Sequence, residues 1–507
     1  MSSKLELGHE KQSKTEGIYT AAFPSERAAA LPSSEQPQQP PQAVEEDGAS
    51  SFDRYSWNGS DDPENPYNWP SLRKISISVI VSFGQLVTLM STSMMAAALG
   101  RISHDLGIDE STTQVTFSIF ILGLAFAPFP IASFSEMYGR KPVWLFCNAF
   151  YVLWNALCPV GSLPALMIIS RFLAGSGASL TGPIMADMYR KEERGKSLAI
   201  ATFVPYLGPA LGPIVGGIIT QKLEWPWLFY LLSIFNAVIW VVGLVFVRES
   251  YGPVLISRKR KAEAASGASS TGPTSLKGAS SKMVANLRRP LQLLWQRPII
   301  QVIALVMALN FGVYCLLLST FATLWINRYR QSEFISTLHY ISVSVGTTIA
   351  TQAGGHFMDW VFAKQKARSP DGSTSPEFRV PCLVPPVILI PVGLFWYGWA
   401  AEVGAHWAVV DVGVAVFVCG SFLLAQAMLA YLLDEFSHAA SANAASRMLS
   451  NVIGFVFPIF APQLFARLGY GWGNSMLAFL FIGLGWPVPL LLWVWGPRLR
   501  ALGRIRH

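Results

Sequence analysis

The chain has 507 residues, of which 52% are hydrophobic and only 13% are charged, and its formal net charge is +8. So few charges in so long a chain argue against a soluble protein and are typical of a polytopic membrane protein. The five cysteines lie in or beside apolar runs without metal-ligand spacing, so we expect neither a metal site nor disulfides. The basic residues fall in short loops rather than on one polar face, which argues against nucleic-acid binding.

The first seventy residues, 1–70, are predicted to form a disordered, acidic tail. They carry twelve acidic and five basic residues among many Pro, Gln and Ser residues, and such a composition cannot bury a hydrophobic core. The N-terminus lacks the charged, apolar and small-residue succession of a cleaved signal peptide. We therefore expect the first span to direct the chain to the membrane.

Twelve apolar segments follow the tail, and each is long enough to cross about 30 Å of hydrocarbon. Only the fourth carries a charge well inside it, at Arg171. The sequence therefore predicts an all-α polytopic membrane protein with twelve transmembrane helices. The segments cover residues 75–99, 111–135, 142–160, 165–186, 197–221, 227–247, 298–325, 335–358, 381–401, 407–433, 447–466 and 473–495.

A polar, low-complexity stretch at 248–297 separates the sixth segment from the seventh and includes the run RKRK at 258–261. It divides the spans six and six, which predicts two six-helix bundles, 71–247 and 298–496, joined by a cytoplasmic linker. The remaining residues, 497–507, form a short basic tail.

The distribution of Lys and Arg predicts the orientation of the spans. Apart from Arg171, 32 of the 38 Lys and Arg residues fall on one side, while the loops of the other side hold only Arg101, Lys222, Arg328, Arg330 and Arg467. Because basic loops stay in the cytoplasm, both termini and the linker are predicted to be cytoplasmic. We call the sparsely charged side the outer end. The expected location is the cell membrane, with a vacuolar membrane as the alternative.

Three motifs lie in these spans and loops. SFSEMYGRKPVW, residues 133–144, falls between spans two and three; RFLAGSGAS begins at Arg171 in span four; GPALGPIVGG covers 208–217 in span five. They resemble the loop signature, the span-four motif and the span-five antiporter motif of the major facilitator superfamily. Over roughly residues 63–500 the chain resembles the fungal twelve-span drug:proton antiporter family of multidrug and secondary-metabolite exporters. In the loop signature, the usual Gly, Leu and Arg are replaced by Ala132, Phe134 and Met137.

The resemblance implies a major facilitator fold and a secondary active transporter rather than an enzyme. It implies export of a small organic molecule, such as a secondary metabolite, an organic acid or a xenobiotic, by alternating access. The proton gradient is then the energy source and no cofactor is expected; the partners are the substrate and the lipid bilayer, and we expect a monomer. An importer on the same fold, a symporter or a facilitator, is the alternative, and a non-transporting membrane sensor is a third hypothesis.

The resemblance assigns an inner gate to the loop signature, at Glu136, Gly139, Arg140 and Lys141. The Glu136 carboxylate is well placed to cap the helix that begins near 441–447, at the start of span eleven. The alternative is that Arg140 and Lys141 only set the topology. At other cytoplasmic ends, the acidic residues Asp187, Asp434 and Glu435 are expected to be gate or loop residues.

Glycines spaced by four line one face of span five, and two prolines share that spacing. We expect a bent, closely packed surface between the two halves, which the resemblance assigns to antiporters. The alternative is ordinary glycine-mediated packing without a coupling role. The motif residues are Gly208, Pro209, Gly212, Pro213, Gly216 and Gly217.

Arg171 lies about 9 Å from the outer end of span four. The resemblance assigns it to proton coupling, and snorkelling to the surface is the alternative. His339 in span eight is expected to be packed and neutral, with titration near neutral pH as the alternative. Spans one, four, seven and ten usually line the cavity in this family, and each polar residue there either faces the cavity or bonds across a helix interface. The candidate cavity residues are Gln85, Thr88, Asn310, Tyr314 and Gln426.

Overall fold

The computed structural model describes residues 62–177, 180–189, 204–265, 292, 294–368, 375–435 and 439–501. Within these residues every regular element is a helix. Residues 1–61 of the predicted tail, and 266–291 of the predicted linker, lie outside the described residues.

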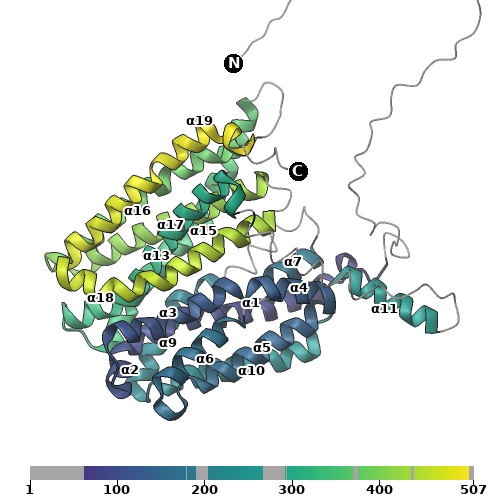
Figure 1. The fold of residues 1–507 in the computed structure, drawn as a ribbon, viewed down its shortest axis with the longest axis horizontal. Helices are drawn as coiled ribbons and strands as arrows, with labels where there is room; N and C mark the ends of the chain where they lie inside the picture. The colour runs from purple at the N-terminus through teal and green to yellow at the C-terminus, as the bar shows by residue number, and fades with distance from the viewer. Residues whose placement is uncertain are drawn as a thin grey trace, which may run out of the picture. The chain divides into compact units, whose positions relative to one another are not determined.

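The helices up to α10 form the N-terminal half, coloured from purple to teal in Figure 1. Within it, α1 packs against α9 and α10, α3 against α6, and α5 against α6 and α10. The elements are η1 (Pro66–Asn68), α1 (Ser71–Ser93), η2 (Met94–Ala98), α2 (Leu99–Leu106), α3 (Glu110–Phe126), α4 (Pro128–Tyr138), α5 (Arg140–Leu157), η3 (Val160–Ser162), α6 (Pro164–Gly175), α7 (Thr181–Met188), α9 (Gly208–Lys222) and α10 (Pro226–Phe246).

The helices from α13 onward form the C-terminal half, in which α13 packs against α18, and α16 and α15 pack against α17. α3 packs against α18 and α9 against α14, so these contacts join the two halves. The elements are α13 (Pro298–Asn327), α14 (Glu333–Leu338), α15 (Ile341–Arg368), η4 (Pro376–Leu383), α16 (Val384–Glu402), α17 (Trp407–Glu435), α18 (Ala439–Gly485) and α19 (Pro487–Ala501).

The helices coincide with the predicted apolar segments, apart from 178–179 and 197–203, which lie outside the described residues. By length and composition, six helical stretches of the described chain are able to cross a membrane, and a seventh is if α3 and α4, bent by 43°, form one span. One of the six stretches contains both α18 and α19, and α18 itself turns at Gly469, where φ is 71°. The all-α, multi-pass fold is confirmed, while the count of twelve crossings stays a prediction.

The predicted linker contains a helix that its low complexity did not indicate. Residues Gly252–Ala265 form α11, because the Ala, Arg and Lys residues of its second half are strong helix formers. Lys259 Nζ lies 3.3 Å from a carboxylate oxygen of Asp62 and 3.3 Å from one of Glu64. The start of the linker therefore contacts the residues that precede α1.

The glycine face of α9 packs against α1 and η2 of the same half. A Cβ added at Gly212 would lie 2.5 Å from Ser93 Oγ, and one at Gly216 would lie 2.7 Å from the Met94 carbonyl oxygen. The prediction of one closely packed face is confirmed, but its placement between the halves is wrong for these glycines. Gly217, the residue after Gly216, packs against the other half: a Cβ at Gly217 would lie 2.2 Å from Thr337 Oγ1 in α14.

Gly212→Leu is expected to destabilise the fold by roughly 1–3 kcal/mol, because the larger side chain has to displace α1. Gly483→Leu is the matched control, since Gly483 lies in α18 with no atom within 4 Å of an added Cβ. Thermal unfolding of the two purified variants beside the wild type measures the effect. Equal melting temperatures for the two variants would contradict the close packing of α9 on α1.

Candidate functional site

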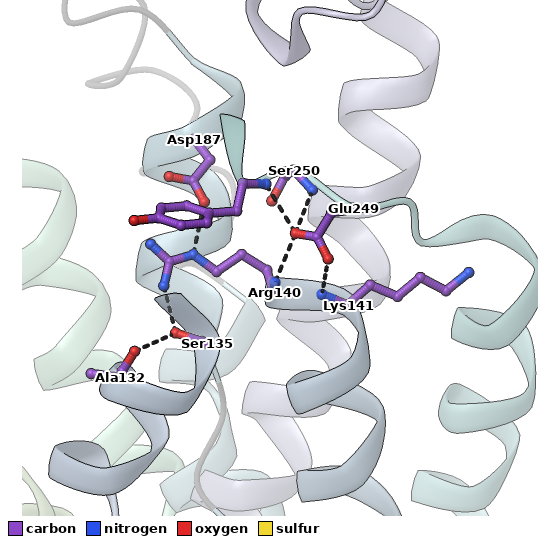
Figure 2. Close-up of polar contacts among 8 residues, drawn as sticks. Ala132, Ser135, Arg140, Lys141, Asp187, Glu249 and Ser250 are labelled. Atoms are coloured by element: carbon purple, nitrogen blue, oxygen red, sulfur yellow. Dashed lines mark hydrogen bonds and ion pairs between the residues drawn. The ribbon is translucent and has the colours of Figure 1, made fainter. Parts of the chain in front are cut away.

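The N-terminus of α5 is capped by a carboxylate from the segment that follows α10 (Figure 2). Glu249 is only 6% exposed and accepts hydrogen bonds from the backbone N–H groups of Arg140, at 2.7 Å, and Lys141, at 3.2 Å. It also accepts from the backbone N–H groups of Ser250 and Tyr251, at 3.1 and 3.0 Å. The carboxylate satisfies N–H groups that have no partner within the helix and complements the positive end of the helix dipole.

The absence of a side chain at Gly139 leaves space for the Glu249 carboxylate. The Gly139 backbone has φ 102° and ψ 163°, a conformation that side chains with a Cβ rarely adopt. A Cβ at this position would lie 2.2 Å from Glu249 Oε2. The glycine of the loop signature is therefore required by a glutamate from another part of the chain.

Arg140 is buried and joins four segments of the N-terminal half (Figure 2). Its Nε donates to Asp187 Oδ2 at 2.9 Å, and its Nη1 donates to Ser135 Oγ at 2.5 Å. Its guanidinium carbon lies 4.5 Å from the centre of the Tyr251 ring. Burial raises the pKa of Asp187, and the neighbouring Arg140 charge opposes that shift. A charge that only set the topology would need no such set of partners.

A similar pair stands at the Lys- and Arg-rich end of the C-terminal half. Arg379 Nε donates to Asp434 Oδ2 at 2.9 Å, and the guanidinium carbon lies 4.3 Å from the Phe362 ring centre. Arg379 precedes α16 and Asp434 ends α17, much as Arg140 begins α5 and Asp187 ends α7. The two halves therefore use related ion pairs at the same end.

The other two members of the predicted inner gate have different surroundings. Lys141 Nζ donates to the Leu244 carbonyl oxygen at 3.0 Å. Glu136 is exposed on α4. Its expected contact with 441–447 includes Ser441, whose side chain lies outside the described residues, so the capping of span eleven stays a prediction.

Arg171 is enclosed by the N-terminal half and is only 1% exposed. Its Nη2 donates to the carbonyl oxygens of Ser91, at 3.1 Å, and Phe117, at 3.3 Å, and its guanidinium carbon lies 4.7 Å from the Phe120 ring centre. Its Nε is buried without a hydrogen-bond partner in the described part of the chain, where no carboxylate pairs with it. This burial contradicts the snorkelling alternative.

One candidate cavity residue, Tyr314, lies in an aromatic cluster where the halves meet, and a second, Asn310, lies four residues before it on α13. The Phe422 ring centre lies 5.7 Å from that of Tyr314 and 5.8 Å from that of Tyr206, which precedes α9 in the other half. Asn310 Nδ2 donates to the Ser421 carbonyl oxygen at 3.1 Å. Among the described residues, three buried atoms of this region have no hydrogen-bond partner: Asn310 Oδ1, Tyr314 Oη and Ser421 Oγ.

Two of the remaining candidate cavity residues, Gln85 and Thr88, have partners within their own half. Gln85 Oε1 accepts a hydrogen bond from Thr181 Oγ1 at 3.4 Å, and Thr88 Oγ1 donates to the Gly84 carbonyl oxygen at 3.2 Å. Gln426 is half-buried on α17. The structure therefore brings Asn310 and Tyr314 into one site and gives Gln85 and Thr88 local contacts.

Comparison with known proteins decides the family. The sequence model of the Major Facilitator Superfamily matches residues 81–458. The chain belongs to the major facilitator superfamily. It is 34% identical to the efflux pump vrtL of Penicillium aethiopicum over 89% of this chain and 90% of that protein, and 36% identical to the probable efflux pump mfs2 of Aspergillus flavus over 80% and 99%. It is 35% identical to the MFS-type transporter oryF of Aspergillus oryzae over 86% and 92%.

Solved structures show the same fold. The xylose transporter XylE from E. coli, in a partially occluded inward open conformation, matches with a TM-score of 0.59 at 16% identity, over 83% of this chain and 98% of that one. The human organic anion transporter TETRAN matches with a TM-score of 0.54 at 15% identity, over 82% and 99%. Family and relatives together identify a membrane transporter and confirm that the chain is not an enzyme.

Sequence reasoning missed one buried polar pair of this transporter. His339 Nδ1 donates to Asp411 Oδ2 at 2.7 Å, so His339 is packed, as expected, but against a carboxylate. Asp411 is the fifth residue of the apolar segment 407–433 and was not among the candidate residues. An acidic residue inside an apolar segment was the available signal. Glu249 gave no such signal, because nothing in its sequence surroundings indicates a helix cap.

Glu249→Gln is expected to destabilise the transporter by about 1–2 kcal/mol, because the amide loses the charge that complements the α5 N-terminus. Glu224→Gln, at an exposed position between α9 and α10, is the control. Thermal unfolding in detergent should show a lower melting temperature for Glu249→Gln than for the wild type and Glu224→Gln.

Glu136→Gln should instead leave the melting temperature unchanged and slow transport, since the gate role assigned to Glu136 concerns a conformational equilibrium. Normal transport by Glu136→Gln would contradict that role.

Proposed function

We propose that this transporter exports a small organic molecule with an aromatic ring in exchange for protons. The efflux pumps among its fungal relatives support the direction of transport. The aromatic cluster of Tyr206, Tyr314 and Phe422 supports the ring, because aromatic side chains from both halves converge there. Edge-to-face contacts between rings are specific as well as apolar, so such a cluster favours a flat, aromatic ligand.

The polar atoms beside the cluster support a substrate that also forms hydrogen bonds. Asn310 Oδ1, Tyr314 Oη and Ser421 Oγ are buried without a partner in the described chain. Unpaired buried polar atoms are costly and uncommon. A hydroxyl, carbonyl or carboxyl group on the substrate would supply the missing partner during the transport cycle.

The position of Arg171 supports proton coupling through its charge. A guanidinium stays protonated in proteins, so Arg171 does not carry the proton itself. Its charge is buried among backbone carbonyl groups and aromatic rings. In so apolar a site it raises the cost of a second positive charge nearby, which favours proton release from a neighbouring group, or it holds an anionic group of the substrate.

Arg171→Ala is expected to abolish uphill export at normal membrane abundance, and Arg171→Lys should recover little if the planar guanidinium is needed. Comparing metabolites in cells and medium after deletion of the gene identifies the cargo. Its transport into and out of proteoliposomes, with and without an imposed proton gradient, then measures direction and coupling. Gradient-driven export by Arg171→Ala would contradict the role of Arg171, and uptake driven with the gradient by the wild type would show an importer.

Tyr314→Phe is expected to raise the KM for that cargo roughly tenfold, because the phenol is proposed to donate a hydrogen bond to it. Tyr397→Phe is the matched control, since its hydroxyl is also buried and unpartnered in the described chain but its ring packs on Phe321 inside the C-terminal half. Initial rates over a range of cargo concentrations measure both variants. Equal KM values would place the substrate elsewhere.

A further inference from the structure

We propose that His339 and Asp411 form a proton-binding site that keeps the outer end of the transporter closed while the proton is bound. The site lies where α14 meets α15, beside the first turn of α17. Its role in the cycle rests on the proton-coupled export proposed above. Its geometry does not depend on that function.

The pair is buried but reachable. His339 is 8% exposed and the Asp411 side chain 16% exposed. Both line a cavity of about 520 Å³, together with Gln331, Ser342 and Trp407. The other histidines in the described residues, His104, His356 and His406, are exposed. A proton can therefore reach His339 through the cavity. Unlike the exposed histidines, however, the His339 imidazole is largely shielded from solvent.

The surroundings provide complete hydrogen bonding for two charge states. His339 Nδ1 faces Asp411 Oδ2 at 2.7 Å, and Nε2 faces Gln331 Oε1 at 2.9 Å. With oxygen atoms at both nitrogens, the geometry fits an imidazolium that donates twice. Rotation of the Gln331 amide by half a turn presents its NH2 group to Nε2 and fits the neutral ring. The site can thus gain or lose a proton without leaving a ring nitrogen unpaired.

Two further features favour the proton-bound form. The Trp325 ring stacks on the imidazole, with centres 3.6 Å apart and planes 10° apart, and an aromatic face attracts a cation. Asp411 Oδ1 is buried without a hydrogen-bond partner among the described residues. With the proton the pair is neutral, and without it the buried carboxylate has no compensating charge, which is costly in an apolar environment.

The other titratable side chains around the pair are phenols, which do not gain or lose a proton near neutral pH. Tyr329, Tyr340 and Tyr397 are phenols, which ordinarily titrate near pH 10, at about three units above neutrality. The hydroxyl of Tyr329 donates to the Ala405 carbonyl oxygen at 2.8 Å, and that of Tyr340 donates to the Leu318 carbonyl oxygen at 2.6 Å.

Four charged side chains at this end have partners of their own. Arg328 Nη2 donates to the Glu402 carbonyl oxygen at 2.6 Å, and the Glu402 carboxylate accepts from the Gly471 N–H at 3.0 Å. Glu333 pairs with Arg101 at 2.7 Å. Only the His339–Asp411 pair, within the described chain, combines a buried imidazole with a carboxylate.

The short helix α14 connects this pair to the N-terminal half. At its first residue, Glu333 forms the ion pair with Arg101 of α2. In its last turn, Thr337 packs directly on Gly217 of α9. His339 follows as the C-terminal cap residue of α14 and is held by Asp411 of the C-terminal half. α14 therefore carries contacts to both halves, and the pair holds one of its ends.

The direction of the pH effect follows from the burial of charge. Opening the outer end would admit water to the pair and lower the cost of the unprotonated carboxylate. The closed state therefore binds the proton more tightly than the open state, so closure is favoured at low pH and is lost as the pH rises. Each tenfold difference in proton affinity between the closed and open states changes the ratio of closed to open molecules up to tenfold.

The test measures the distance across the outer end as a function of pH. Spin labels at His104→Cys and Asn327→Cys, both exposed positions in opposite halves, report it in lipid nanodiscs. Cys419→Ser removes the half-buried native thiol, and the other four cysteines are buried. At about pH 5 the short-distance population should dominate, and at about pH 8 the long-distance population should grow roughly tenfold relative to it.

The variants distinguish the pair from other titrating groups. His339→Gln and Asp411→Asn should each make the distance distribution independent of pH, whereas His356→Gln, which removes an exposed histidine of α15, should keep the wild-type response. A wild-type distribution that does not change with pH, or a response that persists in both pair variants, would overturn the proposal. Gradient-driven export is measured separately on the wild type in proteoliposomes. Its absence would contradict the proposed function without affecting the distance measurement.

Discussion

A charge buried in a membrane bundle has to find its partners on other helices, because hydrocarbon supplies none. This constraint explains the polar architecture of the N-terminal half. Glu249 binds the N-terminus of α5, Arg140 binds Asp187, and Arg171 binds carbonyl groups of α1 and α3. Each contact joins segments distant in the chain, so the charged residues help to determine which helices stand side by side.

Close approach of the backbone is the second requirement, and α9 meets it on two faces. Gly212 and Gly216 bring α9 against α1 and η2, and Gly217 brings it against α14 of the other half. The GPALGPIVGG motif therefore packs against α1 and η2 on one face and against α14 of the opposite half on the neighbouring face. A helix placed in this way can transmit a shift of α14 to the helix that carries the candidate residues Gln85 and Thr88.

The two ends of the transporter use charge in different ways. At the end rich in Lys and Arg, each half has its own Arg–Asp pair, Arg140 with Asp187 and Arg379 with Asp434. At the outer end Arg101 and Glu333 pair across the halves. Pairs within a half stabilise that half as a unit, whereas a pair between halves is made and broken as they move. Alternating access needs both kinds, because the halves have to stay intact while the contact between them changes.

The class of protein, the approximate spans and the family could be predicted from the sequence, because long apolar segments and local motifs are properties of neighbouring residues. The sequence also identified Gly139 and Arg140, whose spacing belongs to a motif. It did not indicate Glu249 as the partner of Gly139, nor Asp411 as the partner of His339, since partners distant in the chain meet only when helices pack. Likewise, a spacing of four predicts that Gly208, Gly212 and Gly216 share a face, but only the tertiary structure decides that this face meets α1 while Gly217 meets the other half.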